Sequence, residues 1–450
     1  MTTDVVILAA GEGTRMLSTL PKPLHPLLGK PLIEYVLEAS ESLSEKSPVM
    51  VVGHGADLIK DSLGERVRYV EQAELLGTGH AVQQAEELLS EYSDQVLILY
   101  GDMPLIRQDT LRTIIETQSS HDGPMTILTV ESADPRGFGR IKRDSGGNIQ
   151  AIVEEADASP EELLITELNA GIYCFRSDWL WPSLNKLGLS PKGEYYLTDL
   201  VSLAAGEGLS IKSVLAGDPD ELIGINTRVH LAESSQILRK RINQDLMLSG
   251  VTIIDPSSTY IEPGVAIGRD TLIFPNTYLQ GNTTLGQKCL IGPGTRIFNS
   301  QIGNSCEIEF SVIESSLIED GVDIGPFSHL RKGAHLGPGV HVGNFGEIKD
   351  SYLGKGSKMG HFSYVGDAQI GADVNIGAGA ITCNYDGKEK HQTVIKDGVF
   401  IGSDSMLVAP LEIGENSRTG AGSVVTKDVP PDTVVVGIPA RQISKKKKAS

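Results

Sequence analysis

The feature that most constrains the fold of this chain is a six-residue period of aliphatic residues in its C-terminal half. The period includes Ile267, Ile273, Leu279, Leu285, Ile291 and Ile297, and after short slips it returns at Ile395, Ile401, Leu407 and Ile413. Such a period is typical of parallel β-helices, in which each hexapeptide supplies a short strand and a corner. Three hexapeptides make one triangular coil, and stacked coils cover each other's apolar interior. We therefore predict a left-handed β-helix from Val251 to Val425 with roughly nine coils.

The N-terminal half follows a different pattern, in which apolar, β-branched runs alternate with amphipathic stretches. The runs are DVVILAA, SPVMVVGH, VRYVEQ, QVLILYGDMP and GPMTILTV, and the stretches are PLIEYVLEASESL, GHAVQQAEELLSEY and DTLRTIIETQSS. Strands that alternate with helices predict a mostly parallel sheet with helices on both faces, as in a Rossmann-like α/β domain. We expect this domain to span residues 1–226, a linker helix that stops at Gly250 to span 227–250, and the β-helix domain to span 251–450.

Composition argues against several classes of function. The formal net charge of −19 disfavours a general affinity for nucleic acid. No apolar run approaches the ~18 residues of a membrane-spanning helix, and no secretory signal opens the sequence. The four cysteines form no CxxC pair and have no metal-ligand spacing, so we expect a reduced, cytoplasmic protein. The basic run Lys445–Lys448 is expected to be a solvated tail, with a binding role as the alternative.

A glycine-containing loop follows the first predicted strand. From Leu8 to Met16 it reads LAAGEGTRM, in which small residues let backbone N–H groups approach phosphates and a base closely. The loop lacks the third glycine of a dinucleotide fingerprint and the GK[ST] of a Walker loop, so its spacing alone is weak evidence. Lys22 follows between two prolines, which hold one cation on a restrained segment.

This loop and the following PKP segment resemble those of the sugar-1-phosphate nucleotidylyltransferases. The resemblance implies that Leu8, Ala9, Ala10, Gly11 and Gly13 embrace the nucleotide, that Arg15 and Lys22 neutralise its phosphates, and that Gln72, Gly77 and Thr78 read uracil. It also implies sugar contacts from Gly139, Glu154 and Asn169, and Mg²⁺ ligation by Asp102 and Asn226, of which Asn226 also contacts the nucleotide sugar. The implied reaction is in-line attack of a sugar phosphate on the α-phosphorus of UTP with loss of pyrophosphate. Because the nucleophile is already an anion, positioning and charge neutralisation supply the catalysis.

A second group of polar residues lies off the aliphatic period of the predicted β-helix. Arg331 and Lys349 are 18 positions apart, so we expect them to be neighbours on successive coils. Two stacked cations repel each other unless an anion joins them, which favours a phosphate site. His361 is a candidate general base because imidazole titrates near neutral pH. An exposed histidine on a β-helix is more often inert, but Tyr364 and Asn375 nearby in the sequence favour a site.

The strings NFGEIK, GHFSYVGD and NIGAGAITCNYDG resemble the bacterial family of bifunctional N-acetylglucosamine-1-phosphate uridylyltransferase/glucosamine-1-phosphate acetyltransferases, over nearly the whole chain. The resemblance implies that Arg331 and Lys349 bind the sugar phosphate and that Tyr364 and Asn375 hold the sugar. It implies an acetyl-coenzyme A groove lined by Ala378, Asn384, Tyr385, Ser403 and Ala421. It further implies a homotrimer with acetyl sites between neighbouring β-helices. Ile438 stands where family members can have a coenzyme-contacting arginine, and Arg441 is the candidate to replace it.

Two alternatives remain open at this point. The chain could be a single-activity sugar-1-phosphate nucleotidylyltransferase whose β-helix is regulatory, or a catalytically silent assembly scaffold. The set of Arg331, Lys349 and His361 argues against a merely regulatory β-helix, and the intact glycine loop with Lys22 and Asp102 argues against a scaffold. The favoured expectation is that the β-helix acetylates glucosamine 1-phosphate and the N-terminal domain then makes UDP-N-acetylglucosamine for cell-envelope synthesis.

Overall fold

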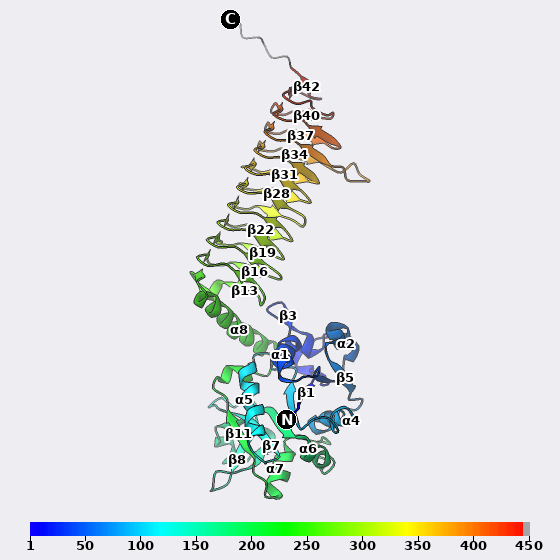
Figure 1. Ribbon diagram of the computed structural model, residues 1–450, viewed down its shortest axis with the longest axis vertical. Coiled ribbons are helices and arrows are strands. Elements are labelled where there is room, and N and C mark those ends of the chain that lie inside the picture. The colour runs from blue at the N-terminus through cyan, green and yellow to red at the C-terminus, as the bar shows by residue number, and fades with distance from the viewer. Residues whose placement is uncertain (444–450) are drawn as a thin grey trace. The chain divides into compact units, whose positions relative to one another are not determined.

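The computed structural model describes residues 1–443, which form two compact units. The first unit is Met1–Leu238 and the second begins at Arg239, so the division falls inside helix α8 (Arg228–Leu248). Figure 1 shows the elements of both units along the chain. Among the described residues, no helix is both long and apolar enough to cross a membrane. The predicted lysine tail at 445–448 lies outside the described residues.

The first unit contains a nine-stranded, mostly parallel sheet, which confirms the predicted fold class. Its parallel strands include β1 (Thr3–Leu8), β4 (Val49–Val52), β5 (Arg68–Glu71) and β6 (Gln95–Tyr100). Strand β1 is central and pairs in parallel with both β4 and β6. All four strands fall inside apolar runs of the sequence, because a strand covered on both faces needs an almost continuous run of apolar residues.

The remaining strands of this sheet bring an antiparallel element that the alternating pattern does not predict. They are β7 (Met125–Glu131), β8 (Arg140–Arg143), β9 (Ile149–Val153), β10 (Glu167–Arg176) and β11 (Lys212–Leu215). Strand β10 runs antiparallel to β6, β7 and β8, and β8 in turn pairs antiparallel with β9. The extra strands β8 and β9 therefore join the sheet at Leu168, near the start of β10.

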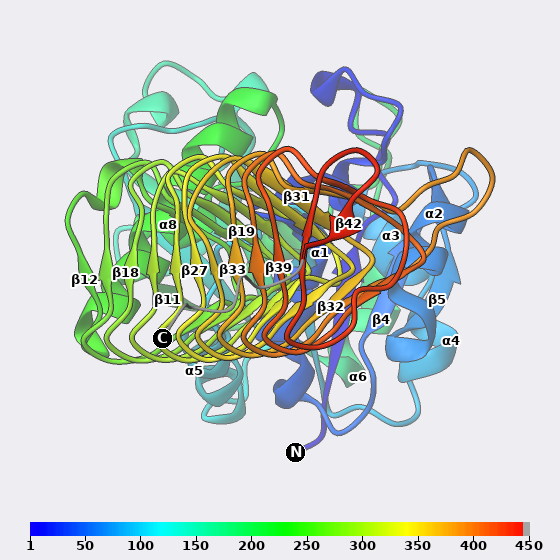
Figure 2. The same ribbon diagram turned by 90° about the horizontal axis from the view of Figure 1, so that it is seen from above.

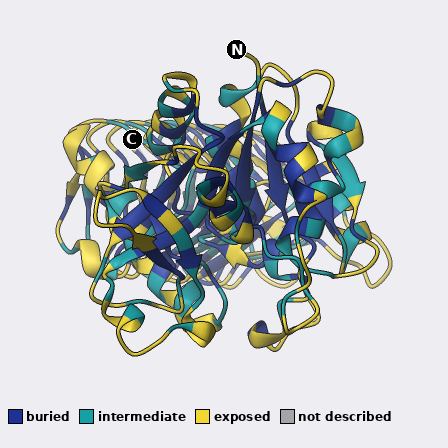
Figure 3. Cartoon of the chain, turned by 90° about the horizontal axis from the view of Figure 1, so that it is seen from below, coloured by how far each residue is buried: buried dark blue, intermediate teal, exposed yellow. Residues whose placement is uncertain are grey.

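Helices cover both faces of this sheet. They are α1 (Leu32–Ser40), α2 (Ala56–Leu63), α3 (Thr78–Gln83), α4 (Glu86–Leu89), α5 (Gln108–Ser119), α6 (Ser177–Leu184) and α7 (Asp199–Gly206). Strand β1 sends Val5 and Ile7 into one apolar core and Val6 into the other, as alternation along a strand requires. The first core contains α1 and α5, and the second contains α3, α6 and α7. Figure 3 shows the buried strands between these layers. The helix expected over 79–92 is divided into α3 and α4.

The second unit is the left-handed parallel β-helix that the six-residue period predicts. Three sheets of 12, 10 and 9 strands run along it, and each complete coil contributes one strand to each sheet. All their strand pairs are parallel except the last pair of the 12-stranded sheet, where β42 (Arg441–Gln442) runs antiparallel to β41 (Val434–Val436). The first coil consists of β12 (Thr252–Ile253), β13 (Tyr260–Ile261) and β14 (Ala266–Ile267). Figure 2 shows the coils one behind another. The 9-stranded sheet defines nine complete coils in the described chain, as predicted.

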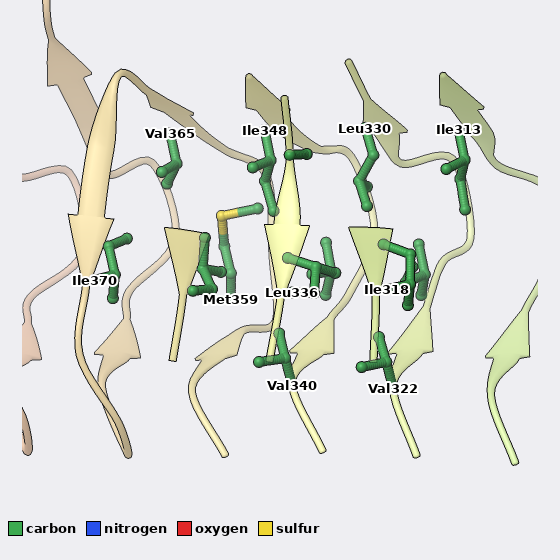
Figure 4. Packing of buried hydrophobic residues seen from close by; sticks show 14 of the residues in the cluster. Ile313, Ile318, Val322, Leu330, Leu336, Val340, Ile348, Met359, Val365 and Ile370 are labelled. Atoms are coloured by element: carbon green, nitrogen blue, oxygen red, sulfur yellow. The ribbon is translucent and has the colours of Figure 1, made fainter. Parts of the chain in front are cut away.

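One continuous apolar core fills the β-helix. Figure 4 shows a row of its members, in which Ile313, Leu330, Ile348 and Val365 lie on successive coils. Burying each such side chain contributes about 1.5–3 kcal/mol, so the stack is stabilised along its whole length. The next inward position of this row is the buried Thr382. Its hydroxyl is not left unpaired, because it accepts a hydrogen bond from the Gly366 N–H at 2.8 Å.

The predicted interruption of the period is a loop that leaves the stack. It joins β34 (Ile381–Cys383) to β35 (Thr393–Ile395) and projects from the coils, in orange in Figures 1 and 2. A single antiparallel bridge between Tyr385 and Lys390 narrows it. Asp386 accepts hydrogen bonds from the backbone of Lys388 and Glu389 at 2.8 Å each, so the loop has a defined turn.

Candidate active sites

The glycine loop lies where β1 ends, at the carboxyl edge of the parallel strands. The Ala9 N–H donates to the Val51 carbonyl at 2.9 Å and the Ala10 carbonyl accepts from His54 at 3.1 Å, so the loop is tied to the end of β4. Gly13 has φ of +63°, and a Cβ there would lie 2.7 Å from the Cβ of Lys22. Only glycine therefore allows the loop to approach Lys22 this closely.

A cavity of about 290 Å³ opens beside this loop. The predicted nucleotide residues among its lining are Leu8, Ala9, Ala10, Gly11, Lys22, Gln72, Gly77, Thr78 and Asp102. Gln72 donates a hydrogen bond to the Gly77 carbonyl at 3.0 Å, which joins two of the residues expected to read the base. The structure thus gathers residues that are far apart in the sequence around one cavity.

Lys22 occupies the centre of the predicted phosphate and metal site. It lies at the start of the 3-10 helix η2 (Lys22–Leu24), and its ammonium donates to the Asp102 carboxylate and, at 3.2 Å, to the Asn226 amide oxygen. The Ile225 N–H donates to the Asp102 carbonyl at 2.9 Å, which keeps the Asn226 segment beside Asp102. Two hard oxygens already arranged around a cation fit a divalent ion. The described residues contain no cluster of three or more His, Cys, Asp or Glu suited to a metal.

Arg15 has a different position from the other predicted phosphate ligands. It lies on the short 3-10 helix η1 (Thr14–Met16), is exposed, and is absent from the lining of both cavities of this unit. Its neighbour Met16 is buried, which anchors the loop while leaving the arginine in solvent.

A second cavity, of about 650 Å³, adjoins the first. Its lining includes the three predicted sugar residues, Gly139, Glu154 and Asn169, together with Asn226. Both cavities share Thr78, Tyr100, Asp102 and Tyr196, so the two spaces have a common wall. The shared aromatic residues Tyr100 and Tyr196 were not identified from the sequence, because nothing in their local pattern distinguishes them from core residues.

Hydrogen bonds hold the polar residues of the second cavity in place. Asn169 donates from its amide to the Tyr173 hydroxyl at 2.7 Å, and Thr198 donates to Glu154 at 3.1 Å. Burial raises the pKa of the Glu154 carboxyl, against the lowering effect of the Thr198 hydroxyl. A carboxylate and an amide facing one cavity can accept from and donate to the hydroxyl and amide groups of a sugar.

On the β-helix, Arg331 and Lys349 lie on successive coils as expected. Arg331 follows β25 (His329–Leu330), Lys349 ends β28 (Gly346–Lys349), and the Arg331 N–H donates to the Ile348 carbonyl at 2.8 Å. From the sequence, we expected an anion to relieve the repulsion between these two cations. In the structure, carboxylates already do so, because Arg331 pairs with Glu347 at 2.9 Å and Lys349 pairs with Asp350.

The other predicted acceptor residues fall on two sheets and the corner between them. Tyr364 lies on β31 (Ser363–Gly366), in the sheet that contains β28, whereas Asn375 lies on β33 (Asn375–Ile376), in a different sheet. His361 is exposed at the corner between β30 (Lys358–Met359) and β31. A Cβ on Gly366 would lie 2.3 Å from the Tyr364 hydroxyl, so this glycine makes room for the phenol.

The projecting loop adds a cation that the sequence reasoning missed. The ammonium of Lys349 lowers the pKa of Lys390, which lies in the projecting loop. Asp367 also belongs to this cluster, since it lies 3.9 Å from Lys349 and accepts from the Asn384 amide. Only the folding of the loop brings Lys390 here, so its sequence spacing gave no signal.

Three of the residues expected to line a coenzyme groove, Ala378, Ser403 and Ala421, form a column along one corner of the β-helix. The Ala378 carbonyl accepts from the Asp404 N–H at 2.7 Å, and the Ser403 carbonyl accepts from the Gly422 N–H at 2.8 Å. Ala378, Ser403 and Ala421 therefore follow one another on successive coils above the corner of His361. Tyr385 and Arg441 are both exposed, the latter on β42 (Arg441–Gln442).

Comparison with known proteins finds similarity along the whole chain. Residues 4–218 match the Nucleotidyl transferase family model, and residues 392–427 match the model of the Bacterial transferase hexapeptide (six repeats). The chain is 44% identical to the bifunctional protein GlmU of Shouchella clausii over 98% of this chain and 97% of that relative. It is 48% identical to the bifunctional protein GlmU of Syntrophomonas wolfei subsp. wolfei, over 97% of each chain. For the bifunctional protein GlmU of Enterococcus faecalis the identity is 45%, over 98% of this chain and 96% of the relative.

Proposed function

The chain belongs to the family of the bifunctional GlmU proteins, and we propose that its two units catalyse two consecutive reactions. The β-helix transfers an acetyl group from acetyl-coenzyme A to glucosamine 1-phosphate. The N-terminal unit then joins the product, N-acetylglucosamine 1-phosphate, to UMP from UTP, which gives UDP-N-acetylglucosamine and pyrophosphate. Both co-substrates and the free thiols of all four cysteines suit the cytoplasm, where we place the reactions.

In the uridylyl transfer, the glycine loop and Gln72 hold the nucleotide in the first cavity, and the second cavity holds the sugar. A phosphate oxygen of the sugar phosphate attacks the α-phosphorus of UTP, and the bond to pyrophosphate breaks. No proton has to move, because the nucleophile is already ionised. Lys22 neutralises charge at the reacting phosphates, and Arg15 contributes to this once the exposed loop meets the triphosphate.

The wall that the two cavities share is the observation that carries this assignment. Asp102 and Thr78 line both cavities, so a nucleotide in one and a sugar phosphate in the other meet beside Lys22. We assign Asp102 and Asn226 as the residues that would hold Mg²⁺, which supplies Lewis-acid stabilisation of negative charge on the phosphates. Asp102 contributes the charge and Asn226 a neutral oxygen, and Lys22 lies between them.

In the acetyl transfer, His361 acts as the general base. The amino nitrogen of glucosamine 1-phosphate attacks the thioester carbonyl, the C–N bond forms and the C–S bond breaks. His361 accepts the proton from the amine, and the released thiolate takes up a proton as coenzyme A leaves. Arg331, Lys349 and Lys390 hold the sugar phosphate, with the carboxylates of Glu347 and Asp350 as their partners when the substrate is absent.

A homotrimer completes this site. Tyr364 and Asn375 lie on different sheets of one β-helix, with His361 at the corner between them. One small substrate contacts both side chains most simply when a neighbouring copy supplies one of them. The coenzyme extends along the column of Ala378, Ser403 and Ala421, close to Asn384 and Tyr385, and Arg441 reaches its far end.

A single assay distinguishes this function from its rivals. The protein is incubated with acetyl-coenzyme A, glucosamine 1-phosphate, UTP and Mg²⁺, and free thiol and pyrophosphate are measured separately. We expect both products, with pyrophosphate dependent on prior thiol release. Pyrophosphate without thiol, when N-acetylglucosamine 1-phosphate or another sugar phosphate is supplied directly, would identify a nucleotidylyltransferase with a regulatory β-helix. Neither product under any of these conditions would identify a scaffold.

A further inference from the structure

We propose that Arg140 is a positioning residue for the sugar cavity, because its buried guanidinium fixes the segments that carry Gly139, Glu154 and Asn169. The proposal rests on the proposed uridylyl transfer and adds a residue that acts on it from outside the cavity. Arg140 does not line either cavity, so it contacts neither substrate and acts only through its neighbours.

The backbone of Arg140 stands at the junction of these three segments. Arg140 begins β8, where it pairs with Val153 of β9 and with Leu168 of β10. Gly139 directly precedes Arg140, and Glu154 and Asn169 directly follow its two strand partners. All three residues expected to contact the sugar are therefore one position away from Arg140 or from a residue paired with it.

The side chain of Arg140 ties two of the segments together. It is 2% exposed and donates to the Phe138 carbonyl and, at 3.0 Å, to the Glu155 carboxylate. Phe138 precedes Gly139, and Glu155 follows Glu154. The ion pair thus clamps the loop that carries Gly139 to the loop that carries Glu154.

The fold by itself gives little reason for this charge. The ion pair joins a buried guanidinium to a carboxylate that is 42% exposed, so it contributes little to stability, and apolar residues of similar volume often replace a buried charge without loss. The Arg140 Nε atom is also buried without a hydrogen-bond partner in the described structure, which adds to the cost. A costly buried guanidinium whose acceptors are both in the cavity wall points to a role in shaping that wall.

The packing around Gly139 transmits any displacement to the cavity. A Cβ on Gly139 would lie 2.7 Å from Ile152, and the Gly139 carbonyl accepts from the Asn169 N–H at 2.8 Å. Gly139 therefore has little freedom to move without shifting Asn169. Loss of the Arg140 clamp should loosen the sugar cavity and leave the nucleotide cavity, which is built from other segments, unchanged.

The test is steady-state pyrophosphate release by the full-length protein carrying Arg140→Met. We expect the KM for N-acetylglucosamine 1-phosphate to rise on the order of tenfold, because misplaced contacts weaken substrate alignment. The KM for UTP should stay within about twofold of the wild type, as should thiol release by the β-helix. Arg143→Met is the matched control, because Arg143 lies on the same strand but pairs with Glu167 at 2.6 Å and lines neither cavity.

A second pair of variants separates positioning from a general loss of stability. Glu155→Ala removes the partner of Arg140 from a residue that is 42% exposed, so it is expected to fold. We expect the double variant Arg140→Met/Glu155→Ala to have the same KM for N-acetylglucosamine 1-phosphate as Arg140→Met alone, because the two changes remove the two ends of the same ion pair. If Arg140→Met does not fold, Arg140→Lys replaces it. We then expect a KM for N-acetylglucosamine 1-phosphate above that of the wild type.

The proposal is overturned if the folded Arg140 variant keeps a sugar-phosphate KM within about twofold of the wild type. It is also overturned if both KM values rise together while the thermal midpoint falls, because that pattern indicates a structural role alone. Failure of the proposed function has a different signature, since the wild type itself would then release no pyrophosphate from UTP and the sugar phosphate.

Discussion

Lys22 donates a hydrogen bond to the carboxylate of Asp102, a residue 80 positions further along the chain. The same ammonium reaches the Asn226 amide oxygen at 3.2 Å. Asp102 and Asn226 are the two proposed metal ligands, so the lysine holds them together before any substrate is bound. In the proposed reaction, Lys22 would turn from these oxygens towards the phosphates of the nucleotide. The contact therefore links the preformed site to the charge neutralisation expected during uridylyl transfer.

Replacement of Lys22 by methionine should separate catalysis from metal affinity. We expect Lys22→Met to lower the rate of pyrophosphate release by roughly 100-fold or more, because one cationic donor at the reacting phosphates is lost. Without substrates, however, the variant should bind Mn²⁺ more tightly than the wild type, since Asp102 and Asn226 no longer hold an ammonium. Kinetic assays and Mn²⁺ titration by electron paramagnetic resonance measure the two effects. Lys30→Met, which removes an ion pair with Glu38, is the control and should change neither.

The half-buried Glu154 predicts a particular pH dependence of stability. Burial raises the pKa of its carboxyl in the folded state, so folding favours the protonated form. Its favourable contribution is present below the unfolded pKa of about 4.3 and is lost as the pH rises through the higher folded value. We therefore expect Glu154→Gln to raise the thermal midpoint at pH 7.5, with a gain that disappears near pH 4.

Tryptophan fluorescence can follow this transition in the first unit alone. The chain has two tryptophans, Trp179 and Trp181, and both lie on α6. Glu116→Gln, at an exposed position on α5, provides a control that should leave the midpoint unchanged at both pH values. Equal midpoints for wild type and Glu154→Gln at pH 7.5 would show that burial of the Glu154 charge carries no cost.

Lys390 should contribute to binding of the acetyl acceptor. Lys390→Ala removes one charge-assisted contact to the sugar phosphate, and such a contact is worth about 1.5–3 kcal/mol. We expect the KM for glucosamine 1-phosphate to rise roughly 10- to 100-fold in thiol-release assays, with little change for acetyl-coenzyme A. Lys388→Ala is the matched control, because Lys388 is exposed in the same loop. Similar KM values for the two variants would remove Lys390 from the site.

The β-helix core predicts that substitutions at two adjacent residues lower the free energy of unfolding by very different amounts. On β18 (Leu290–Ile291), Ile291 is fully buried whereas Leu290 is 38% exposed. Ile291→Ala should lower the free energy of unfolding by about 2–5 kcal/mol, because it leaves a cavity in the stack. Leu290→Ala should cost less than about 1 kcal/mol. Urea unfolding of the second unit, followed by far-ultraviolet circular dichroism, measures the difference, and equal losses would contradict the inward register.

Periodic features of this fold were predictable, whereas its departures from periodicity were not. The inward row of Ile313, Leu330 and Ile348 repeats because every coil presents the same narrow interior. Strand β1 was equally visible as an apolar run. The antiparallel direction of β10 could not be predicted, because its sequence ELNAGIYCFR is compatible with either strand direction. Its direction depends on which neighbouring strands it joins, and the local sequence does not encode that choice.

The same distinction applies to the sites. Lys22, Asp102 and Asn226 were identified through resemblance to a family, and the structure brings these three residues together. Lys390 was missed because only a folded loop places it near Lys349. The prediction that a bound anion must compensate the charge of Arg331 was incomplete for a similar reason, since the carboxylate of Glu347 on the next coil already does so. Sequence motifs indicated the chemical groups, but not every partner that each one meets.

The central claim is that one chain contains two separate active sites, and a two-product assay of two variants tests it most directly. Thiol and pyrophosphate are measured for His361→Ala and Asp102→Ala, with glucosamine 1-phosphate and N-acetylglucosamine 1-phosphate supplied in separate reactions. We predict that His361→Ala loses thiol release and keeps pyrophosphate release from N-acetylglucosamine 1-phosphate, and that Asp102→Ala shows the reverse. Loss of both products in either folded variant would contradict separate sites.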